Sequence, residues 1–405
     1  MMRRPMKIAA LLAAMLLAAL LPARADSSAN DIARFLAGMP PSADSPLTPL
    51  TREPAWQRHA RFFDSAFGQL EQRQLAKIRS WSATNLLSPK PTMFYMFSGP
   101  DFLYAGVFYP RATTYVLSAL EPVGSVPDLT RLSRGALGNS LHDVERSLGS
   151  MLSFSFFITE HMKSDLQAGQ LHGALPILYV FLARSGKIIR EVVPVTLDDK
   201  GVLLGQTTSA GKNLTQGVRI GFAGEDGVER TMYYFSTDLS NSGVKNSGFL
   251  KFCETLAPGD SLLKSASYLL HSGNFSIARA FLLNHSAAIV QDDSGIPLGN
   301  FAADKWRFSA FGRYKGPIDK FPGRYQSKYS EQFRQSQPID FGIGYRWRTY
   351  ETNLLLAMRQ PSDGPGGVET AETRQRDRVA PARPLHRPQV VEPGGFWWFG
   401  RPSRW

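Results

Sequence analysis

The clearest hydrophobic pattern in the chain is a pair of apolar runs separated by a glycine-proline turn. Thr92 to Phe97 is continuously apolar and aromatic, which is typical of a strand covered on both faces. Ser98-Gly99-Pro100-Asp101 then interrupts the pattern, and Phe102 to Phe108 has the composition of a short helix. A second apolar run, Thr113 to Leu120, follows. This order predicts a βαβ crossover, which packs onto a parallel sheet.

Before the crossover the hydrophobic pattern has a helical period. Pro54 suits the first turn of a helix, and the apolar residues after it recur at three- and four-residue steps. They are Trp56, Ala60, Phe63, Phe67 and Leu70, and Leu75 and Ile78 extend the stripe. A shorter helix is predicted from Asn30 to Met39, with Ser28 as its cap and Pro40-Pro41 as its stop. The opening of the chain therefore predicts a helical cap packed on the sheet.

Beyond the crossover, helical and strand patterns alternate. The clearest hairpin joins Gly217 to Phe222 with Arg230 to Phe235 through a Gly-Glu-Asp-Gly turn. Buried segments are predicted at Leu175 to Leu182 and Ile188 to Leu197. Helices are predicted at Asn139 to Met151 (capped by Asn139), Phe249 to Leu256, Ser261 to His271 and Phe275 to His285. Strands are predicted at Ala287 to Val290 and, as edge strands, at Trp306 to Tyr314 and Ile339 to Arg348.

These elements predict an α/β fold with one large domain over residues 26–360. Its mixed sheet contains at least one parallel βαβ unit and is flanked by helices. Residues 361–405 are rich in Pro, Gly and Arg and lack a periodic apolar pattern, so they are predicted to form a disordered tail. The tail ends in an aromatic tip, Phe396, Trp397, Trp398 and Phe399. The tip is expected either to dock on the domain or to contact a protein partner or a membrane surface.

Residues 1–25 have the pattern of a secretory signal peptide. Arg3, Arg4 and Lys7 precede an apolar stretch from Ile8 to Leu21, and Ala23-Arg24-Ala25 is a small-x-small cleavage pattern. The mature chain is therefore expected to begin at Asp26 and to be periplasmic or secreted. A retained anchor is the alternative, although the apolar stretch is short for a membrane span.

The binding partners that the basic charge indicates depend on whether the chain is exported. Removing the four basic residues of the leader lowers the formal net charge from +12 to +8. Outside the cytosol no nucleic-acid partner is expected, and the acidic partners at hand are anionic lipids or cell-wall polymers. A saccharide is a further candidate ligand, because aromatic and arginine side chains can present stacking faces. Plain solubility is the alternative reading of the charge.

The crossover resembles the first βαβ unit of Rossmann-type methyltransferases, and only this unit carries the resemblance. In those proteins a glycine-containing turn follows the first strand, and an acidic residue after the second strand holds a ribose. The resemblance implies a cofactor site at Gly99, Asp101 and Glu121, and Gly99 and Glu121 have the usual separation of about 20 residues. This turn has a single glycine, and Pro100 lacks a backbone donor. A crossover that serves only the core is the alternative, and no cofactor is predicted.

Two neighbouring carboxylates, Asp292 and Asp293, follow the strand predicted at Ala287 to Val290. They are candidate catalytic residues, because paired carboxylates can act as general base and acid. Successive residues of a strand point to opposite faces, so at most one of them is expected to face a pocket. Asp-Asp-Ser-Gly is also ordinary turn chemistry. The histidines have no metal-ligand spacing, so no metal site is predicted.

Two classes of function remain open from the sequence. The first is a non-catalytic envelope protein that binds an anionic or saccharide-like ligand or acts as a scaffold for a protein partner. The second is an enzyme, either a repurposed Rossmann-type transferase or a hydrolase that uses Asp292 or Asp293. A single concave pocket lined by Gly99, Glu121 and Asp293 would favour the enzyme.

Overall fold

The computed structural model of the 405-residue chain describes residues 24–156, 170–205 and 214–360. The predicted leader lies almost wholly outside these residues, and so do the predicted tail and its aromatic tip. Their roles stay predictions. Within the described residues no helix is both long enough and apolar enough to cross a membrane.

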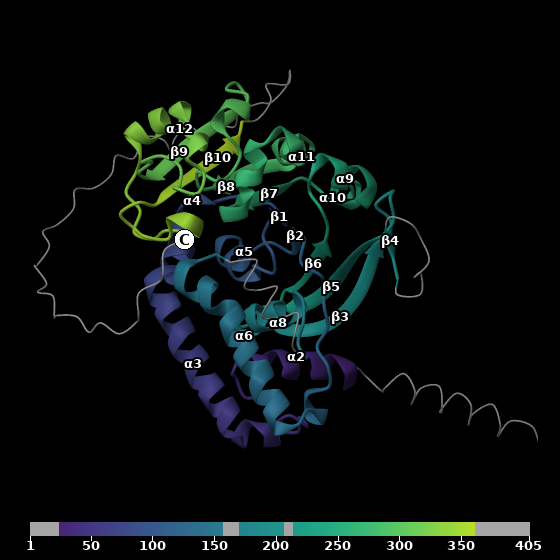
Figure 1. The fold of residues 1–405 in the computed structure, drawn as a ribbon. Coiled ribbons are helices and arrows are strands. Elements are labelled where there is room, and N and C mark those ends of the chain that lie inside the picture. Colours follow the sequence, from purple (N-terminus) through teal and green to yellow (C-terminus); the bar gives the residue numbers. More distant parts are fainter. Residues whose placement is uncertain (1–23, 157–169, 206–213, 361–405) are drawn as a thin grey trace, which may run out of the picture. The chain divides into compact units, whose positions relative to one another are not determined.

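The described residues form one α/β unit built on a large sheet (Figure 1). The strands lie in the order β4-β3-β5-β6-β2-β1-β7-β8-β10-β9. In chain order they are β1 (Thr92–Met96), β2 (Thr114–Ala119), β3 (Ile188–Leu197), β4 (Leu203–Leu204), β5 (Thr215–Ala223), β6 (Glu229–Ser236), β7 (Gly259–Leu263), β8 (Ser286–Gln291), β9 (Trp306–Gly312) and β10 (Asn353–Arg359). The predicted fold class, a mixed sheet with flanking helices, is confirmed.

The centre of the sheet is parallel and its margins are antiparallel. Strands β6, β2, β1, β7 and β8 run in the same direction. On one side β5 pairs antiparallel with β6, β3 with β5 and β4 with β3. On the other side β10 pairs antiparallel with both β8 and β9. The predicted βαβ crossover is confirmed, because β1 and β2 are parallel and the helix α5 (Phe102–Phe108) joins them.

The chain adds parallel strands first on one side of β1 and later on the other. The chain adds β2 and then β6 on one side of β1, whereas β7 and then β8 are added on the other side. Numbered by their appearance in the chain, the five parallel strands therefore lie in the order 3-2-1-4-5. The gap between the loops that leave β1 and β7 is a topological switch point, where open α/β sheets place their ligands.

Helices cover both faces of the sheet, which explains the continuous apolar runs of the inner strands. Met93 and Tyr95 of β1 belong to one core cluster and Phe94 and Met96 to another, because successive side chains point to opposite faces. The first face carries α2 (Arg24–Leu36), α3 (Pro54–Leu70), α4 (Ala76–Asn85), α5, α6 (Arg134–Phe154) and α8 (Leu175–Arg184). The second carries α9 (Asn241–Ser247), α10 (Phe249–Thr255) and α11 (Ser276–His285). A short α12 (Ser327–Gln332) packs near β9.

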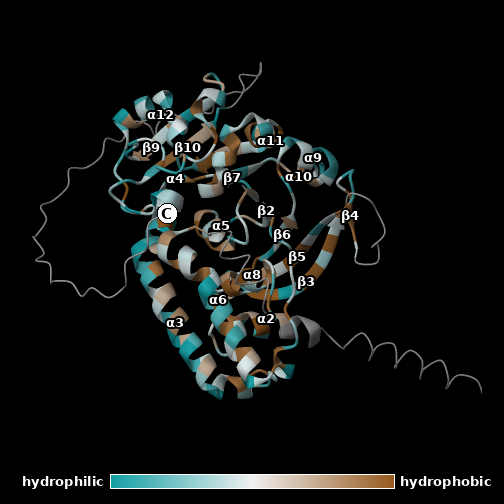
Figure 2. Cartoon of the chain, viewed as in Figure 1, coloured by the Kyte–Doolittle hydropathy of each residue, from teal (hydrophilic) through white to brown (hydrophobic). Residues whose placement is uncertain are grey.

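The amino-terminal helices match the predicted apolar stripe. Helix α3 begins at Pro54 and continues through a π-helical turn, Glu71–Leu75, into α4. Its buried residues include Trp56, Phe63, Phe67 and Leu70. Helix α3 lies along α6, where His59 contacts Glu145 at 2.9 Å (Figure 1). Helix α8 is apolar on all sides and buried, whereas α3 and α6 keep a polar side (Figure 2).

Several local predictions were wrong. Ser133, rather than Asn139, caps α6, since its hydroxyl accepts a hydrogen bond from the Ala136 N–H at 3.2 Å. The predicted helix at Ser261 to His271 is instead the strand β7 followed by a 3₁₀ helix, Ser265–His271. The strand predicted at Ile339 to Arg348 is a loop with one 3₁₀ turn, and the strand that pairs with β8 and β9 is β10.

Candidate ligand-binding site

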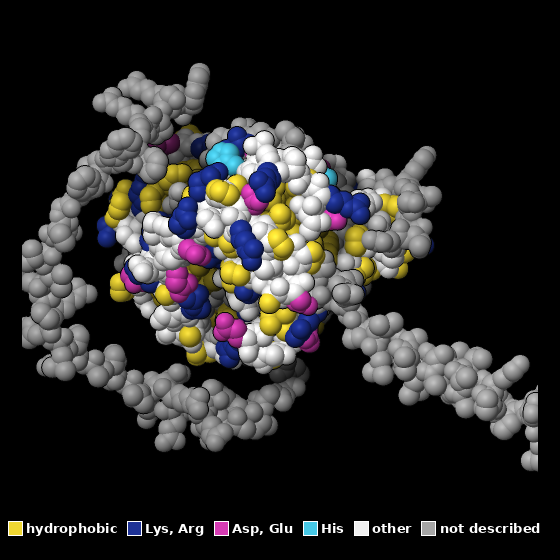
Figure 3. Space-filling view, turned by 90° about the horizontal axis from the view of Figure 1, so that it is seen from below, with side chains coloured by type: hydrophobic (Ala, Val, Ile, Leu, Met, Phe, Trp, Pro, Cys, Tyr) yellow, Lys and Arg dark blue, Asp and Glu magenta, His cyan; other side chains and the backbone are white. Residues whose placement is uncertain are grey.

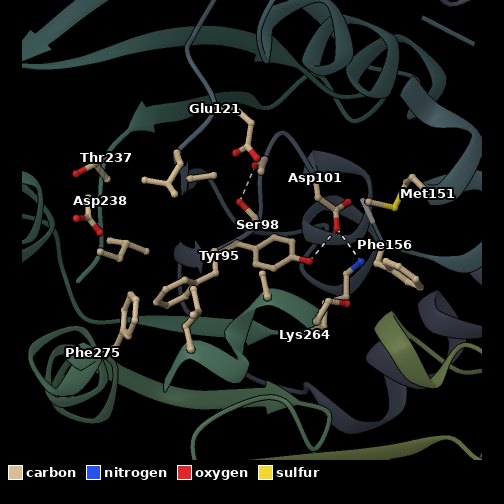
Figure 4. Close-up of a pocket in the computed structure, with 18 of the residues that line it drawn as sticks. Tyr95, Ser98, Asp101, Glu121, Met151, Phe156, Thr237, Asp238, Lys264 and Phe275 are labelled. Atoms are coloured by element: carbon tan, nitrogen blue, oxygen red, sulfur yellow. Dashed lines mark hydrogen bonds and ion pairs between the residues drawn. The ribbon is translucent and has the colours of Figure 1, made fainter. Parts of the chain in front are cut away.

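A pocket lies at the carboxyl ends of the central strands, at the switch point next to β1. Its cavity volume is about 210 Å³. The loops that follow β1, β2, β6 and β7 supply most of its lining, and the end of α6 supplies part of the remainder. Figure 4 shows Thr237, Asp238 and Phe275 at one end and Asp101, Lys264 and Phe156 at the other. Glu121 and Ser98 lie between these ends.

The turn after β1 is backbone-strained and leaves few donors for a ligand. Phe97 and Gly99 have φ values of 63° and 60°, the left-handed region that a non-glycine residue adopts only at a cost. Pro100 has no N–H group. Asp101 caps α5, because its carboxylate accepts a hydrogen bond from the Tyr104 N–H at 3.2 Å. A carboxylate therefore already occupies the start of this helix.

A buried ion pair forms one end of the pocket. The Lys264 ammonium lies 2.9 Å from Asp101 Oδ2, and both side chains are at most 2% exposed. The Tyr95 hydroxyl donates to the same carboxylate oxygen at 2.8 Å. Burial lowers the pKa of Lys264, and the attraction of Asp101 opposes that shift. Burial raises the pKa of Tyr95 well above its usual value, with the Asp101 carboxylate adding to the shift, so the phenol stays a donor.

Lys264 also ties the pocket to the end of α6. Its ammonium donates to the backbone oxygen of Ser155 and lies 4.0 Å from the centre of the Tyr104 ring. The Ser155 hydroxyl accepts from the Gly344 N–H at 3.1 Å. Met151 and Phe156, on either side of Ser155, line the pocket. The ammonium therefore links the loop after β1, the helix α5 and the end of α6.

Glu121 stands in the middle of the pocket, directly after β2. Its side chain points into the cavity (Figure 4), and the residue is only 6% exposed. The Tyr234 hydroxyl donates to its backbone oxygen at 2.8 Å, which fixes the start of the loop. Gly99, Asp101 and Glu121, the residues that the sequence singled out for a ligand, therefore line one pocket.

The opposite end of the pocket combines polar groups with an aromatic ring. Within the described residues the buried Thr237 hydroxyl has no hydrogen-bond partner. Asp238 accepts from the Ser240 N–H at 2.8 Å and from the Ser240 hydroxyl at 2.7 Å, which orients its carboxylate. The Phe275 ring meets Phe97 edge-on, with 5.8 Å between ring centres. An unsatisfied hydroxyl and an oriented carboxylate beside a ring are suited to a polar ligand with an apolar face.

The two candidate catalytic carboxylates do not line this pocket. Asp293 accepts hydrogen bonds from Tyr268 and, at 3.1 Å, from the Asn353 side chain, and it lies 3.3 Å from Arg346. Asp292 Oδ1 accepts from Ser294. Both aspartates are at most 2% exposed. The arrangement that would have favoured an enzyme, with Gly99, Glu121 and Asp293 lining one pocket, is not seen, because Asp293 is not part of this lining.

Asp292 nevertheless lies close to Ser265, a residue of the pocket lining. Its Oδ2 atom and the hydroxyl of Ser265, which lines the pocket, have no hydrogen-bond partner within the described part of the chain. A Cβ atom on Gly344 would lie 2.6 Å from Asp292 Oδ2 and 2.7 Å from Ser265 Oγ, so the two oxygens converge on one point. Burial, and then the charge of Asp293, raise the pKa of Asp292 to about 7. Ser265 has a strained φ of 61°.

Sequence reasoning missed Lys264, Ser265, Thr237 and Asp238. Ser261 to Leu263 was assigned to a helix, so the polar pair Lys264-Ser265 was not recognised as the end of a central strand. An apolar run followed at once by polar residues, as at β1 and β2, also marks the end of β6 before Thr237 and Asp238, whereas β7 has only two apolar residues before Lys264. Within the described residues no three His, Cys, Asp or Glu side chains gather around a position for a metal ion.

Comparison of the chain with protein-family models, curated proteins and solved structures finds no match. The function is therefore argued from the pocket alone.

Proposed function

We propose that the protein binds a small ligand that carries hydroxyl groups on a ring, the chemistry shared by saccharides and nucleosides. The observation that carries this proposal is the position of Glu121. Its buried carboxylate follows β2 and faces the cavity beside the turn of Gly99, at the switch point. In doubly wound sheets an acidic residue at this place accepts hydrogen bonds from ribose hydroxyls.

The charges of the lining favour a neutral or cationic ligand over an anionic one. Asp101, Glu121 and Asp238 face a single ammonium, that of Lys264, which Asp101 already neutralises. The lining therefore carries three carboxylates and one ammonium, so an anion would be repelled. Asp101 at the start of α5 and the missing N–H of Pro100 also remove the donors that a phosphate needs. Of the ligands expected from the sequence, the saccharide fits this lining better than an anionic envelope component.

The strand order supports the nucleoside arm of the proposal. The parallel strands follow the order 3-2-1-4-5, which is the start of the dinucleotide-binding doubly wound order. A transferase that uses an adenosyl cofactor, as the methyltransferase resemblance implies, would place that cofactor over Gly99 and Glu121. An exported protein meets little of such a cofactor, so the saccharide arm fits the predicted compartment better.

The test is a titration of the mature protein with glucose, N-acetylglucosamine, adenosine and S-adenosylmethionine by isothermal calorimetry. We expect either the two saccharides or the two adenosine compounds to bind. The substitution Glu121→Gln should weaken that binding 10- to 100-fold, because it removes a charged hydrogen bond worth about 1.5–3 kcal/mol. Glu229→Gln is the control, because Glu229 is exposed at the opposite end of β6. Binding that is unaffected by Glu121→Gln, or no binding by any of the four compounds, would exclude this use of the pocket.

A hydrolase is the second candidate, and the Asp292–Ser265 arrangement favours it. A carboxylate whose pKa lies near 7 suits a general base at neutral pH. The Ser265 hydroxyl, which lines the pocket, and Asp292 Oδ2 converge beside Gly344, and Ser265 begins a strained turn from strand to helix. Labelling of Ser265 by a fluorophosphonate, detected by peptide mass spectrometry and abolished by Asp292→Asn, would support hydrolysis. An unlabelled Ser265 at high probe concentration would argue for a binding protein.

We also propose that the protein is exported. The support is the leader pattern in the sequence. The face shown in Figure 3 bears on the expected partners instead. There Lys and Arg side chains are interspersed with Asp and Glu instead of forming one basic patch. Such a surface favours solubility over nucleic-acid binding. Mass spectrometry of the protein from a cell fraction should find a mature amino terminus near Asp26, and an intact leader on cytosolic protein would refute export.

A further inference from the structure

The apolar rim of the pocket points to a ligand larger than its cavity. A cavity of about 210 Å³ is smaller than the roughly 300–1,000 Å³ of usual small-molecule pockets. It can enclose a ring with its hydroxyl groups but little more. Any remaining part of the ligand must therefore lie at the mouth of the pocket.

Exposed apolar side chains stand at this mouth. Leu120, directly after β2, is 62% exposed, and Leu269, in the 3₁₀ helix after β7, is 45% exposed. Both line the pocket, on opposite sides of β1. Single exposed leucines need no explanation, but two that line one cavity place apolar surface on both sides of its mouth. Phe97 and Phe275, whose rings are in contact, add further apolar surface to the lining.

Most polar groups of the lining lie deeper than this rim, although Asp238 is exposed. Glu121 is 6% exposed, and the Asp101–Lys264 pair is at most 2% exposed on both side chains. A molecule that satisfies both regions has a hydroxylated head inside and an apolar chain across Leu120 and Leu269. A purely polar ligand would leave the leucines in water, and a purely apolar one would leave the buried Thr237 hydroxyl, which has no hydrogen-bond partner within the described residues, unsatisfied.

We propose that the ligand is an amphiphile, in which an alkyl or acyl chain is attached to a hydroxylated ring, as in a glycolipid. This inference rests on the proposed function, since the same pocket holds the ring. Full burial of a methylene group stabilises a complex by about 0.8 kcal/mol, which corresponds to about a fourfold change in Kd. A chain on a half-open rim should contribute about half of that free energy, or about twofold for each methylene.

The test compares methyl, butyl and hexyl glucosides, and adenosine with its 5′-O-hexanoyl ester, by calorimetry below their micelle concentrations. We expect the hexyl glucoside to bind at least tenfold more tightly than the methyl glucoside, or the hexanoyl ester to exceed adenosine similarly. In Leu120→Ser and Leu269→Ser this ratio should fall toward one, because any change in head binding cancels in the ratio. Leu87→Ser is the matched control, since Leu87 is 71% exposed but precedes β1 at the opposite edge of the sheet.

The outcomes separate this inference from the proposed function. Binding of the head compounds with no gain from the chain overturns the amphiphile and leaves the ring-binding function standing. A chain gain that persists unchanged in both leucine variants also overturns it, because the chain would then lie elsewhere. If no compound binds, with or without a chain, both proposals fail.

Discussion

Replacing Lys264 by methionine should destabilise the protein, because the substitution leaves the buried Asp101 carboxylate without its cation. The two groups lie 2.9 Å apart, and Lys264 also contacts the Ser155 backbone oxygen and the Tyr104 ring. Breaking a buried ion pair by removing one partner costs about 3–5 kcal/mol. Tyr95 and the Tyr104 N–H still bind Asp101, so we expect a loss near the lower limit, about 3 kcal/mol.

The double variant Asp101→Asn with Lys264→Met tests the cause of this loss. Burial lowers the pKa of Lys264 despite the attraction of Asp101, so the pair does not fully offset the cost of taking the ammonium out of water. Removing both charges should therefore cost no more than the worse single substitution. The coupling free energy between the two positions is then about 2–3 kcal/mol, the upper range for residues in contact.

Urea denaturation followed by tryptophan fluorescence measures these losses, since Trp56, Trp81 and Trp306 are buried. Lys77→Met is the matched control, because Lys77 pairs with Asp340 at 3.6 Å on the surface, where an ion pair is worth about 0–1 kcal/mol. A Lys264→Met loss equal to that of Lys77→Met would refute the reasoning. So would a double variant whose loss equals the sum of the two single losses.

Three further predictions concern other parts of the unit. Because the pKa of Asp292 is raised in the folded state, the folded protein binds a proton that the unfolded chain has lost between about pH 4 and 7. The contribution of Asp292 to the free energy of unfolding therefore falls as the pH rises from about 4 to 7. The substitution Asp292→Asn should flatten the pH dependence of the urea midpoint over this range. Gly344→Ala should destabilise the protein more than Gly227→Ala and weaken ligand binding. Both glycines have positive φ, but a Cβ on Gly344 meets Asp292 and Ser265, whereas one on Gly227 meets nothing. Truncation after Gln360 should preserve the circular dichroism spectrum and melting temperature, whereas truncation after Thr352 should unfold the protein because it removes β10.

A specific result would contradict each of these three predictions. An Asp292→Asn profile parallel to the wild-type profile between pH 4 and 7 would assign the pH dependence to other groups. Equal losses for the two glycine variants would mean that backbone strain alone, about 1–3 kcal/mol at such positions, sets the cost. A large fall in melting temperature after truncation at Gln360 would show that residues 361–405 contribute to the core.

The local hydrophobic pattern was enough to predict an element where its neighbours in space are also its neighbours in sequence. The run Thr92 to Phe97 predicted a strand covered on both faces, and β1 is buried along its whole length. The hairpin of β5 and β6 was equally readable, because its two strands pair across a short turn. Gly99, Asp101 and Glu121 could be grouped for the same reason, since one crossover brings the ends of β1 and β2 to the same edge.

Long-range pairing decided the elements that were misassigned. Ser261 to Leu263 fits both a helix and a strand by its apolar spacing. It becomes β7 because it fills the place between β8 and β1, and the residues of β1 lie far away along the chain. The same holds for β10, which inserts between β8 and β9. Hydrogen bonds to distant strands, which a local window of sequence does not contain, outweighed the local preference.

The sequence by itself determined the α/β class, the first crossover and the three residues that begin the pocket, because these depend on periodicity and on contacts close along the chain. Only the tertiary structure decided the strand order, and with it the placement of Lys264, Thr237 and Asp238 around Glu121. The physical reason is that a site at the carboxyl ends of parallel strands is assembled from loops far apart in sequence. Which loops meet there depends on how the sheet as a whole satisfies its hydrogen bonds and buries both faces.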